Sequence, residues 1–195
     1  MERGFKKKSE DQALIYRNEL GLMYYDPLPA ETLARKLRIQ ILTPRDIPNI
    51  TPEILNQLTR TDSNSWSALT ISNNGLKIII HNPHHSQARQ ESNLMHEIAH
   101  ILCEHRPSQF VQLDGFPFSI RTCDKTQEEE ARWLGGCLQI PRRALVWAFG
   151  KNMDASEISE HYSASKDLVK YRINMTGVRI QFSRQGFYRK RKGNA

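Results

Sequence analysis

The stretch His96-Glu97-Ile98-Ala99-His100 decides how the rest of the chain is interpreted. The two histidines are four positions apart, so on an α-helix both imidazoles lie on one face and can bind one metal ion from the same side. Glu97 lies one position around the helix, where its carboxylate can reach a water molecule beside such an ion. The pattern therefore predicts His96 and His100 as metal ligands and Glu97 as the catalytic general base.

The residues around this motif predict the element that carries it. Residues 86–105 place four apolar side chains on one helical face, which predicts a long, partly buried helix. The chain has seven histidines, and six of them lie between positions 81 and 105. The spacing of His84, His85 and His105 does not require a metal, so we interpret these three as loop or helix-end histidines.

A catalytic zinc site needs a third protein ligand and an open fourth position. Three consecutive acidic residues begin the next predicted helix, over residues 126–139. Glu128 shares its helical face with the small residues Ala131 and Gly135, which would let this helix come close to the histidine-bearing helix. Glu130 shares its face with bulkier residues. This pattern favours Glu128 as the third ligand and leaves Glu130 as the alternative.

The rest of the chain predicts short helices and a small sheet. The Ser72–Gly75 turn between two β-branched runs, residues 66–71 and 76–80, predicts a hairpin. Further strands are expected over residues 37–42 and 117–122. Helices are expected over residues 10–24, 29–37, 52–59, 141–149, 155–162 and 165–175. The predicted fold class is α+β, mostly helical, with a small antiparallel sheet.

The motif residues also carry a family resemblance. His96–His100, followed by Glu128-Glu129-Glu130-Ala131-Arg132-Trp133-Leu134-Gly135-Gly136-Cys137-Leu138-Gln139-Ile140-Pro141, resembles the ImmA/IrrE family of metallopeptidases. The second motif of that family resembles E-x-E-A-N-x-F-A-x-x-L-L-x-P. The positions that agree are Glu128, Glu130, Ala131, Leu138 and Pro141. Two departures are Arg132, where the family often has Asn or Asp, and Leu134-Gly135 in place of Phe-Ala. The resemblance covers roughly residues 10–150.

This resemblance implies a zincin-like fold and a zinc-dependent (Zn2+) endopeptidase of the bacterial or phage cytoplasm. Such proteins typically cleave one transcriptional repressor, often encoded beside them, and so relieve repression. It implies that His96, His100 and Glu128 hold the zinc and that Glu97 transfers protons. The oxyanion-stabilising group is unassigned; His161 and Tyr162 are candidates because they are polar and lie beyond the motifs.

Residues 154–178 resemble a helix-turn-helix, with the turn at residues 162–165. They are interpreted either as two amphipathic helices that pack against the peptidase body or as a repressor-like pair that contacts DNA or the substrate. The predicted organisation is a basic tail over 1–9, a peptidase domain over 10–150, the helical segment over 151–182 and a basic tail over 183–195. The alternative function is a non-proteolytic, metal-binding regulator that binds DNA or a repressor.

The net charge of +7 belongs to the two ends of the chain. Residues 1–8 sum to +3 and residues 184–195 to +5, whereas residues 9–183 sum to −1. We therefore interpret the ends as solvated tails, with a weak nucleic-acid contact as the alternative. The three cysteines form no C-x-x-C pair, which favours a reducing cytosol and small buried roles for Cys103 and Cys137. No apolar run suits a membrane span or a signal peptide.

Overall fold

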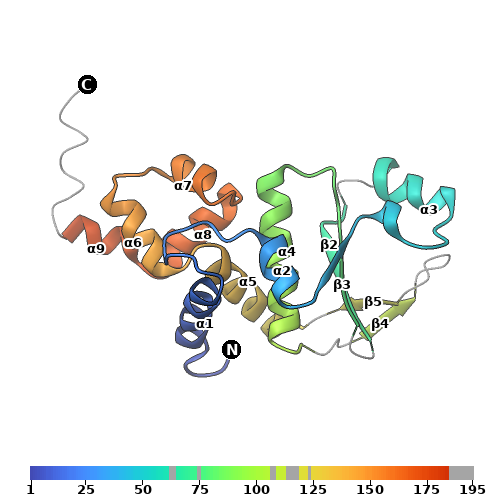
Figure 1. Ribbon diagram of the computed structural model, residues 1–195, viewed down its shortest axis with the longest axis horizontal. Coiled ribbons are helices and arrows are strands. Elements are labelled where there is room, and N and C mark those ends of the chain that lie inside the picture. The colour runs from blue at the N-terminus through green and yellow to red at the C-terminus, as the bar shows by residue number, and fades with distance from the viewer. Residues whose placement is uncertain (62–64, 74–75, 106–108, 113–118, 123, 185–195) are drawn as a thin grey trace.

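Helix α4 (Gln87–Leu102) lies between a small sheet on one side and a group of helices on the other (Figure 1). The structure is a computed structural model that describes residues 1–61, 65–73, 76–105, 109–112, 119–122 and 124–184. Because α4 is the element predicted to carry the metal-binding motif, its surroundings decide the shape of the candidate site.

Helices and strands are interspersed as far as β5 (Ser119–Thr122), and only helices follow in the described residues after it. They are α1 (Phe5–Glu19), α2 (Ala30–Lys36), β1 (Gln40–Leu42), the 3-10 turn η1 (Pro44–Asp46), α3 (Pro52–Asn56), the π-type turn η2 (Gln57–Thr61), β2 (Ala68–Asn73), β3 (Leu76–His81), α4, β4 (Gln109–Gln112), β5 (Ser119–Thr122), α5 (Lys125–Gln139), α6 (Arg142–Gly150), α7 (Ala155–His161), α8 (Lys166–Thr176) and α9 (Val178–Arg184). The α+β fold class, mostly helical with a small sheet, is confirmed.

The main sheet has three strands in the order β1-β3-β2. The predicted hairpin is present, since β2 and β3 pair antiparallel with Leu69 opposite Ile80; residues 74 and 75 of its turn lie outside the described residues. However, β1 pairs parallel to β3, with Ile41 opposite Ile79, so the sheet is mixed rather than purely antiparallel. The Asn-Gly turn predicts only the pairing of β2 with β3. Strand β1 is connected to the hairpin through η1, α3 and η2 rather than through a tight turn, so the sequence carries no turn signal for its pairing with β3.

The apolar face of α4 is buried as predicted. Leu94, Ile98 and Ile101 are at most 8% exposed, and together with α1, α2 and α5 they form the largest apolar cluster. The sheet carries Ile79 into the same cluster. Burial of this face holds α4 rigidly, which fixes the positions of the polar side chains on its opposite side.

Helix α1 begins at Phe5, so residues 5–9, assigned to a solvated basic tail, are helical instead. Its buried residues are Ser9, Ala13 and Arg17, spaced four positions apart. Because two of these three are polar, hydrophobic periodicity does not reveal the buried stripe. Arg17 is satisfied by carbonyl oxygens of Ala13, Asp26 and Gln139 at 3.0–3.2 Å.

The C-terminal helices share one apolar cluster with the end of α5. Ile140 and Leu145 lie before residue 150, and Ile158, Val169 and Val178 lie after it, yet all five belong to that cluster. The segment predicted as a helix pair contains a third helix, α9, which extends into the stretch assigned to the C-terminal tail. Residues 185–195 of that tail lie outside the described residues. This packing favours the interpretation of α7 and α8 as helices that pack on the peptidase body.

In the part of the chain that the structure describes, no helix combines the length and the apolar character that crossing a bilayer would require.

Candidate metal centre

His96 and His100 project from one side of α4, one helical turn apart, as their spacing predicts. Their Nε2 atoms lie 3.1 Å apart and their rings meet edge to face, with centroids 4.7 Å apart. His100 is 4% exposed, whereas 30% of the His96 side chain is exposed. The pair therefore lies at the boundary between the core and an open side of the molecule.

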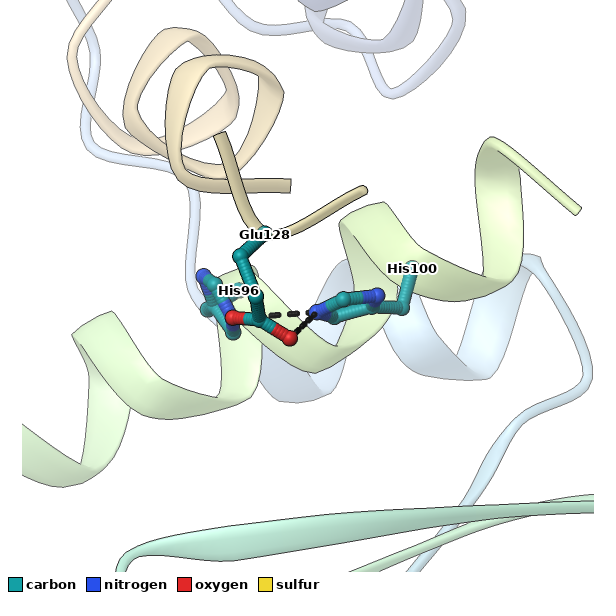
Figure 2. A group of neighbouring side chains, drawn as sticks. All are labelled: His96, His100 and Glu128. Atoms are coloured by element: carbon teal, nitrogen blue, oxygen red, sulfur yellow. Dashed lines mark hydrogen bonds and ion pairs between the residues drawn. The ribbon is translucent and has the colours of Figure 1, made fainter. Parts of the chain in front are cut away.

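Glu128 reaches this pair from the first turns of α5. Its Oε2 lies 3.2 Å from His96 Nε2 and its Oε1 lies 3.3 Å from His100 Nε2. Figure 2 shows the carboxylate facing both imidazoles across the gap between the two helices. One ligand atom from each of the three residues lies within 4.8 Å of the others, a grouping that could hold a metal ion. The structure thus brings together the three residues that the sequence predicts as ligands.

Gly135 explains how α5 comes close enough to α4 for this contact. A Cβ atom built on Gly135 would lie 2.9 Å from the Met95 carbonyl oxygen and 3.0 Å from His96 Cα. Both are backbone atoms of α4, so any larger side chain at position 135 would require α4 and α5 to move apart. The expectation that small residues on the Glu128 face permit a close approach is confirmed.

Glu130, the alternative ligand, lies elsewhere. Its Oε2 is 3.2 Å from His105 Nε2, and its side chain is 17% exposed. His105 in turn places its Nδ1 atom 3.0 Å from Nδ1 of His100. In the described residues Glu130 therefore contacts the far side of the histidine pair through His105, and Glu128 is the carboxylate that meets Nε2 of both predicted ligands.

Glu97 points toward the sheet side of α4. The hydroxyl of Thr70 on β2 donates a 2.5 Å hydrogen bond to Oε2 of Glu97. Thr70 is 5% exposed and Glu97 is half-buried. Because a buried threonine holds the carboxylate, Glu97 has a fixed orientation beside the histidines without being one of the three grouped ligands.

A cavity of about 410 Å³ opens next to these residues. Its walls come mainly from α4, α5 and the first two turns of α8. The lining includes His96, Glu97, Arg132, Asp167, Leu168 and Tyr171. The Arg132 guanidinium lies 4.3 Å from the centroid of the Tyr171 ring, a cation–π contact across the cavity wall. The C-terminal helix α8 therefore forms part of the cavity beside the candidate metal centre.

The electrostatics follow from these contacts. Hydrogen bonds from His100 and then His96 hold the pKa of the Glu128 carboxyl well below its ordinary value, so this carboxylate is ionised at neutral pH. Burial lowers the pKa of His105, although its hydrogen bond to Glu130 acts in the opposite direction. An anionic Glu128 next to neutral imidazoles is the protonation state in which all three bind a cation.

The two oxyanion candidates lie outside the cavity lining. Tyr162 is 3% exposed and its hydroxyl donates to the Tyr25 carbonyl oxygen at 3.0 Å. His161 packs against Trp147 and lies 3.4 Å from the same carbonyl oxygen. Both belong to the packing of α6 and α7 and neither lines this cavity, so the structure gives no support to either as the oxyanion-stabilising group. The polarity of these residues and their position in the sequence do not predict that Tyr162 lies in the C-terminal apolar cluster.

Sequence reasoning missed His105, Thr70 and Tyr171. The spacing of His105 from His100 is five residues, which on a continuous helix would turn the two rings away from each other, and only the end of α4 makes them meet. Thr70 had no signal beyond its place in a strand. Tyr171 lies in the helix-turn-helix-like segment, and nothing in the sequence shows that α8 forms part of the cavity beside α5.

Comparison with known proteins agrees with this geometry. A family model described as the IrrE N-terminal-like domain (Peptidase_M78) matches residues 57–174, more than half of the chain. The match extends from η2 into α8, so it includes the three grouped ligands, Glu97 and the cavity wall. Neither the curated proteins nor the solved structures contain a match to this chain. The chain belongs to the Peptidase_M78 family, and is therefore a peptidase with the IrrE N-terminal-like domain.

Proposed function

We propose that this protein is a zinc-dependent endopeptidase that cleaves a specific cytoplasmic protein, a transcriptional repressor, and thereby relieves repression. His96, His100 and Glu128 are the metal ligands, and Glu97 is the catalytic general base. The observation that carries the proposal is the grouping of the three ligand atoms within 4.8 Å, with Glu97 on the wall of the adjoining cavity.

The donor set fits zinc. Two imidazoles and one carboxylate are a known ligand set of catalytic zinc sites, with metal–ligand distances that put the corners of a tetrahedron about 3.3 Å apart. Here the two Nε2 atoms lie 3.1 Å apart, and each faces a different oxygen of Glu128, His96 facing Oε2 at 3.2 Å and His100 facing Oε1 at 3.3 Å. His96 lines the cavity and half of the Glu128 side chain is exposed, which leaves one side accessible to water and substrate.

The chain's own residues then account for peptide hydrolysis. A bound zinc ion supplies Lewis acidity, which lowers the pKa of water to about 7 and polarises the scissile carbonyl. Glu97 accepts the proton of the attacking water and donates it to the leaving amine. The Thr70 hydroxyl keeps the Glu97 carboxylate in position for both transfers.

The cavity supports a protein substrate. Its volume of about 410 Å³ lies in the range of sites that hold one or two side chains, and it is open to solvent along one side. Arg132 and Asp167 offer opposite charges, while Leu168 and the Tyr171 ring offer apolar surface. A peptide side chain inserted there would be held by the α8 wall while its carbonyl faces His96 and Glu97.

The repressor as substrate rests on the resemblance to the ImmA/IrrE family, with which the family match agrees. The packing of α8 as a cavity wall favours recognition of a protein over recognition of a DNA groove, because Val169, Arg172 and Ile173 bury one side of this helix. We therefore place the regulatory role in cleavage rather than in DNA binding.

The test combines metal content with cleavage. Purified protein should contain one zinc per chain by elemental analysis and should cut the helix-turn-helix repressor encoded beside it, with the new terminus identified by mass spectrometry. Glu97→Gln should keep the zinc and lose at least a thousandfold in cleavage rate. Glu129→Gln, which changes an exposed glutamate on the neighbouring helix, is the matched control and should cleave normally.

Two results would contradict the proposal. One is the absence of zinc from protein that is folded and has intact His96 and His100. The other is zinc at one per chain with identical protein termini in cells that express the wild type and in cells that express Glu97→Gln, compared by terminal-peptide proteomics. The second result would favour a metal-binding regulator that does not cleave.

A further inference from the structure

We infer that His105 and Glu130 are positioning residues that orient His100 for metal binding through a hydrogen-bonded chain Glu130–His105–His100. The inference rests on the proposed metal site and assigns a role to the two residues that the ligand set leaves out. It starts from three distances: 3.2 Å between Glu130 Oε2 and His105 Nε2, 3.0 Å between the Nδ1 atoms of His105 and His100, and 3.3 Å between His100 Nε2 and Glu128 Oε1.

When His100 binds a cation through Nε2 and both imidazoles are neutral, the hydrogen-bonding capacities of these groups allow one arrangement of protons. The Glu130 carboxylate only accepts, so His105 must carry its proton on Nε2. Nδ1 of His105 then has a lone pair and accepts the proton that His100 carries on Nδ1. His100 is left with a lone pair on Nε2, the atom that faces Glu128 and His96. In that state the chain holds His100 in the tautomer that binds a metal.

The backbone brings the two rings together. Helix α4 ends in a Schellman motif, in which the His105 amide donates to the His100 carbonyl oxygen at 3.2 Å and the Glu104 amide donates to the Ile101 carbonyl oxygen at 3.2 Å. Glu104 has a positive φ of 52°, the left-handed conformation that this motif requires. The reversal folds His105 back over the last turn, so residues 100 and 105 are joined by a backbone bond and a side-chain bond at once.

Burial makes this arrangement consequential. His100 is 4% exposed and His105 is 6% exposed, so their bond is formed away from bulk water. A buried hydrogen bond between two polar groups is costly to leave unmade, which restricts rotation of the His100 ring. Glu130 adds negative charge behind the imidazole and makes it a stronger electron donor. Partners of this kind behind metal-binding histidines typically change metal affinity by about 10- to 100-fold.

The first test reads the protons directly and needs no variant. In protein with nitrogen-15-labelled histidine, long-range proton–nitrogen correlation spectra report which ring nitrogen carries the proton. We expect His105 protonated on Nε2 and His100 on Nδ1 in the zinc-loaded protein, where the metal takes the lone pair of His100 Nε2. A His105 ring protonated on Nδ1 as its main neutral form would overturn the inference.

The second test measures metal affinity by competition with a chromophoric chelator. His105→Phe keeps a planar ring and removes both hydrogen bonds, so zinc should bind about 10- to 100-fold more weakly and the cobalt-substituted protein should shift its visible absorption. His105→Gln retains one acceptor and one donor and should stay within about fivefold of the wild type. His84→Phe, an exposed histidine, is the matched control and should bind zinc like the wild type.

The outcomes separate the inference from the proposed function. Zinc binding by the wild type tests the function, whereas the tautomers and the ratio between variants test the role of His105. A folded His105→Phe protein with wild-type affinity and an unchanged cobalt spectrum would overturn the inference while leaving the peptidase intact. If His105→Phe fails to fold, the tautomers of the wild type and the zinc affinity of His105→Gln decide the question. A 100-fold loss of zinc affinity in His105→Gln would contradict the inference, because glutamine retains one donor and one acceptor.

Discussion

The hydroxyl of Thr70 donates a 2.5 Å hydrogen bond to Oε2 of Glu97, so an outer strand of the sheet holds a carboxylate that projects from α4. The two residues are 27 positions apart in sequence and come from different elements. The sequence around either residue alone does not predict the orientation of its side chain. The contact ties the geometry of the candidate general base to the packing of the hairpin against the helix.

Thr70→Val removes the hydroxyl and keeps the shape of the side chain. Without this donor the Glu97 carboxylate is free to rotate, so we expect kcat for peptide cleavage to fall about tenfold while zinc affinity stays unchanged. Thr70→Ser keeps a hydroxyl and serves as the control, with a loss of less than about threefold. Steady-state kinetics and zinc titration of both variants check this, and equal rates for wild type and Thr70→Val would show that the bond has no catalytic role.

Gly135→Ala should separate α4 from α5. The added methyl group meets backbone atoms at 2.9–3.1 Å that cannot turn away as a side chain can, so we expect a loss of about 2 kcal/mol in unfolding free energy and weaker zinc binding. Gly150→Ala is the matched control, because a Cβ there meets nothing within 4 Å. At this helical position alanine should be neutral or stabilising by about 0.5 kcal/mol. Urea unfolding of both proteins distinguishes the two sites.

Leu168→Trp should fill the cavity beside Glu97. Leu168 lines the cavity from α8, and a larger ring there would occupy the space that a substrate side chain needs. We expect kcat/KM to fall at least tenfold through a higher KM, with zinc content unchanged. Lys170→Trp places the same ring at an exposed position of α8 and should leave cleavage unaffected. A normal KM for Leu168→Trp would mean that substrate does not enter this cavity.

The two described cysteines should react slowly with alkylating reagents. Burial, and then the nearby negative charge of Glu130, raise the pKa of Cys103 to about 11, and burial raises that of Cys137 further. A raised pKa means less thiolate at a given pH, so at pH 8 Cys103 should react about 100-fold more slowly than a free cysteine, with a rate that keeps rising up to pH 11. Peptide-resolved mass spectrometry after brief iodoacetamide treatment measures this. A rate that levels off near pH 9 would contradict the raised pKa.

Arg172→Leu should destabilise the whole protein. Arg172 is fully buried, donates to the Ile140 carbonyl oxygen at 3.0 Å and pairs with Glu10 at 2.5 Å, so it joins α8 to α1 and to the end of α5. Its removal leaves a largely buried carboxylate without its cation, which costs about 3 kcal/mol. Arg179→Leu, at an exposed position on α9, is the control. A single cooperative unfolding transition, lowered only by Arg172→Leu, would show that the C-terminal helices unfold with the peptidase body.

The sequence predicted the elements whose signals are local. The position of α4, the hairpin, the helix that begins near Glu128 and the pairing of His96 with His100 follow from spacing over a few residues, whereas the choice of Glu128 over Glu130 needed the small residues on its helical face and the family resemblance. The parallel pairing of β1, the polar buried stripe of α1 and the role of α8 as a cavity wall depend on contacts between distant segments. Hydrophobic periodicity does not reveal such contacts. The buried guanidinium of Arg17 donates to the Gln139 carbonyl oxygen and that of Arg172 donates to the Glu10 carboxylate, and both partners lie more than 100 positions away in the sequence.

His105 illustrates the same limit on a smaller scale. It follows the motif by only five residues, yet its function depends on whether the helix continues past Leu102 or turns back. A left-handed residue at the end of a helix is usually glycine, and Glu104 gives no such signal. The division of the chain at residue 150 stays a prediction, although residues from both sides of it share one apolar cluster.

The reversal at Glu104 also makes the last turn of α4 and the metal site a single thermodynamic unit. Fraying of that turn would break the hydrogen bond from the His105 amide to the His100 carbonyl oxygen. The same event would move the His105 ring away from the His100 ring. The 10- to 100-fold loss of zinc affinity expected without the His105 ring corresponds to about 1.4–2.7 kcal/mol, which is the most by which zinc at the proposed site would stabilise the closed turn. Zinc at the proposed site would therefore slow the opening of this turn, and slower hydrogen exchange of the His105 amide in zinc-loaded protein measures that effect.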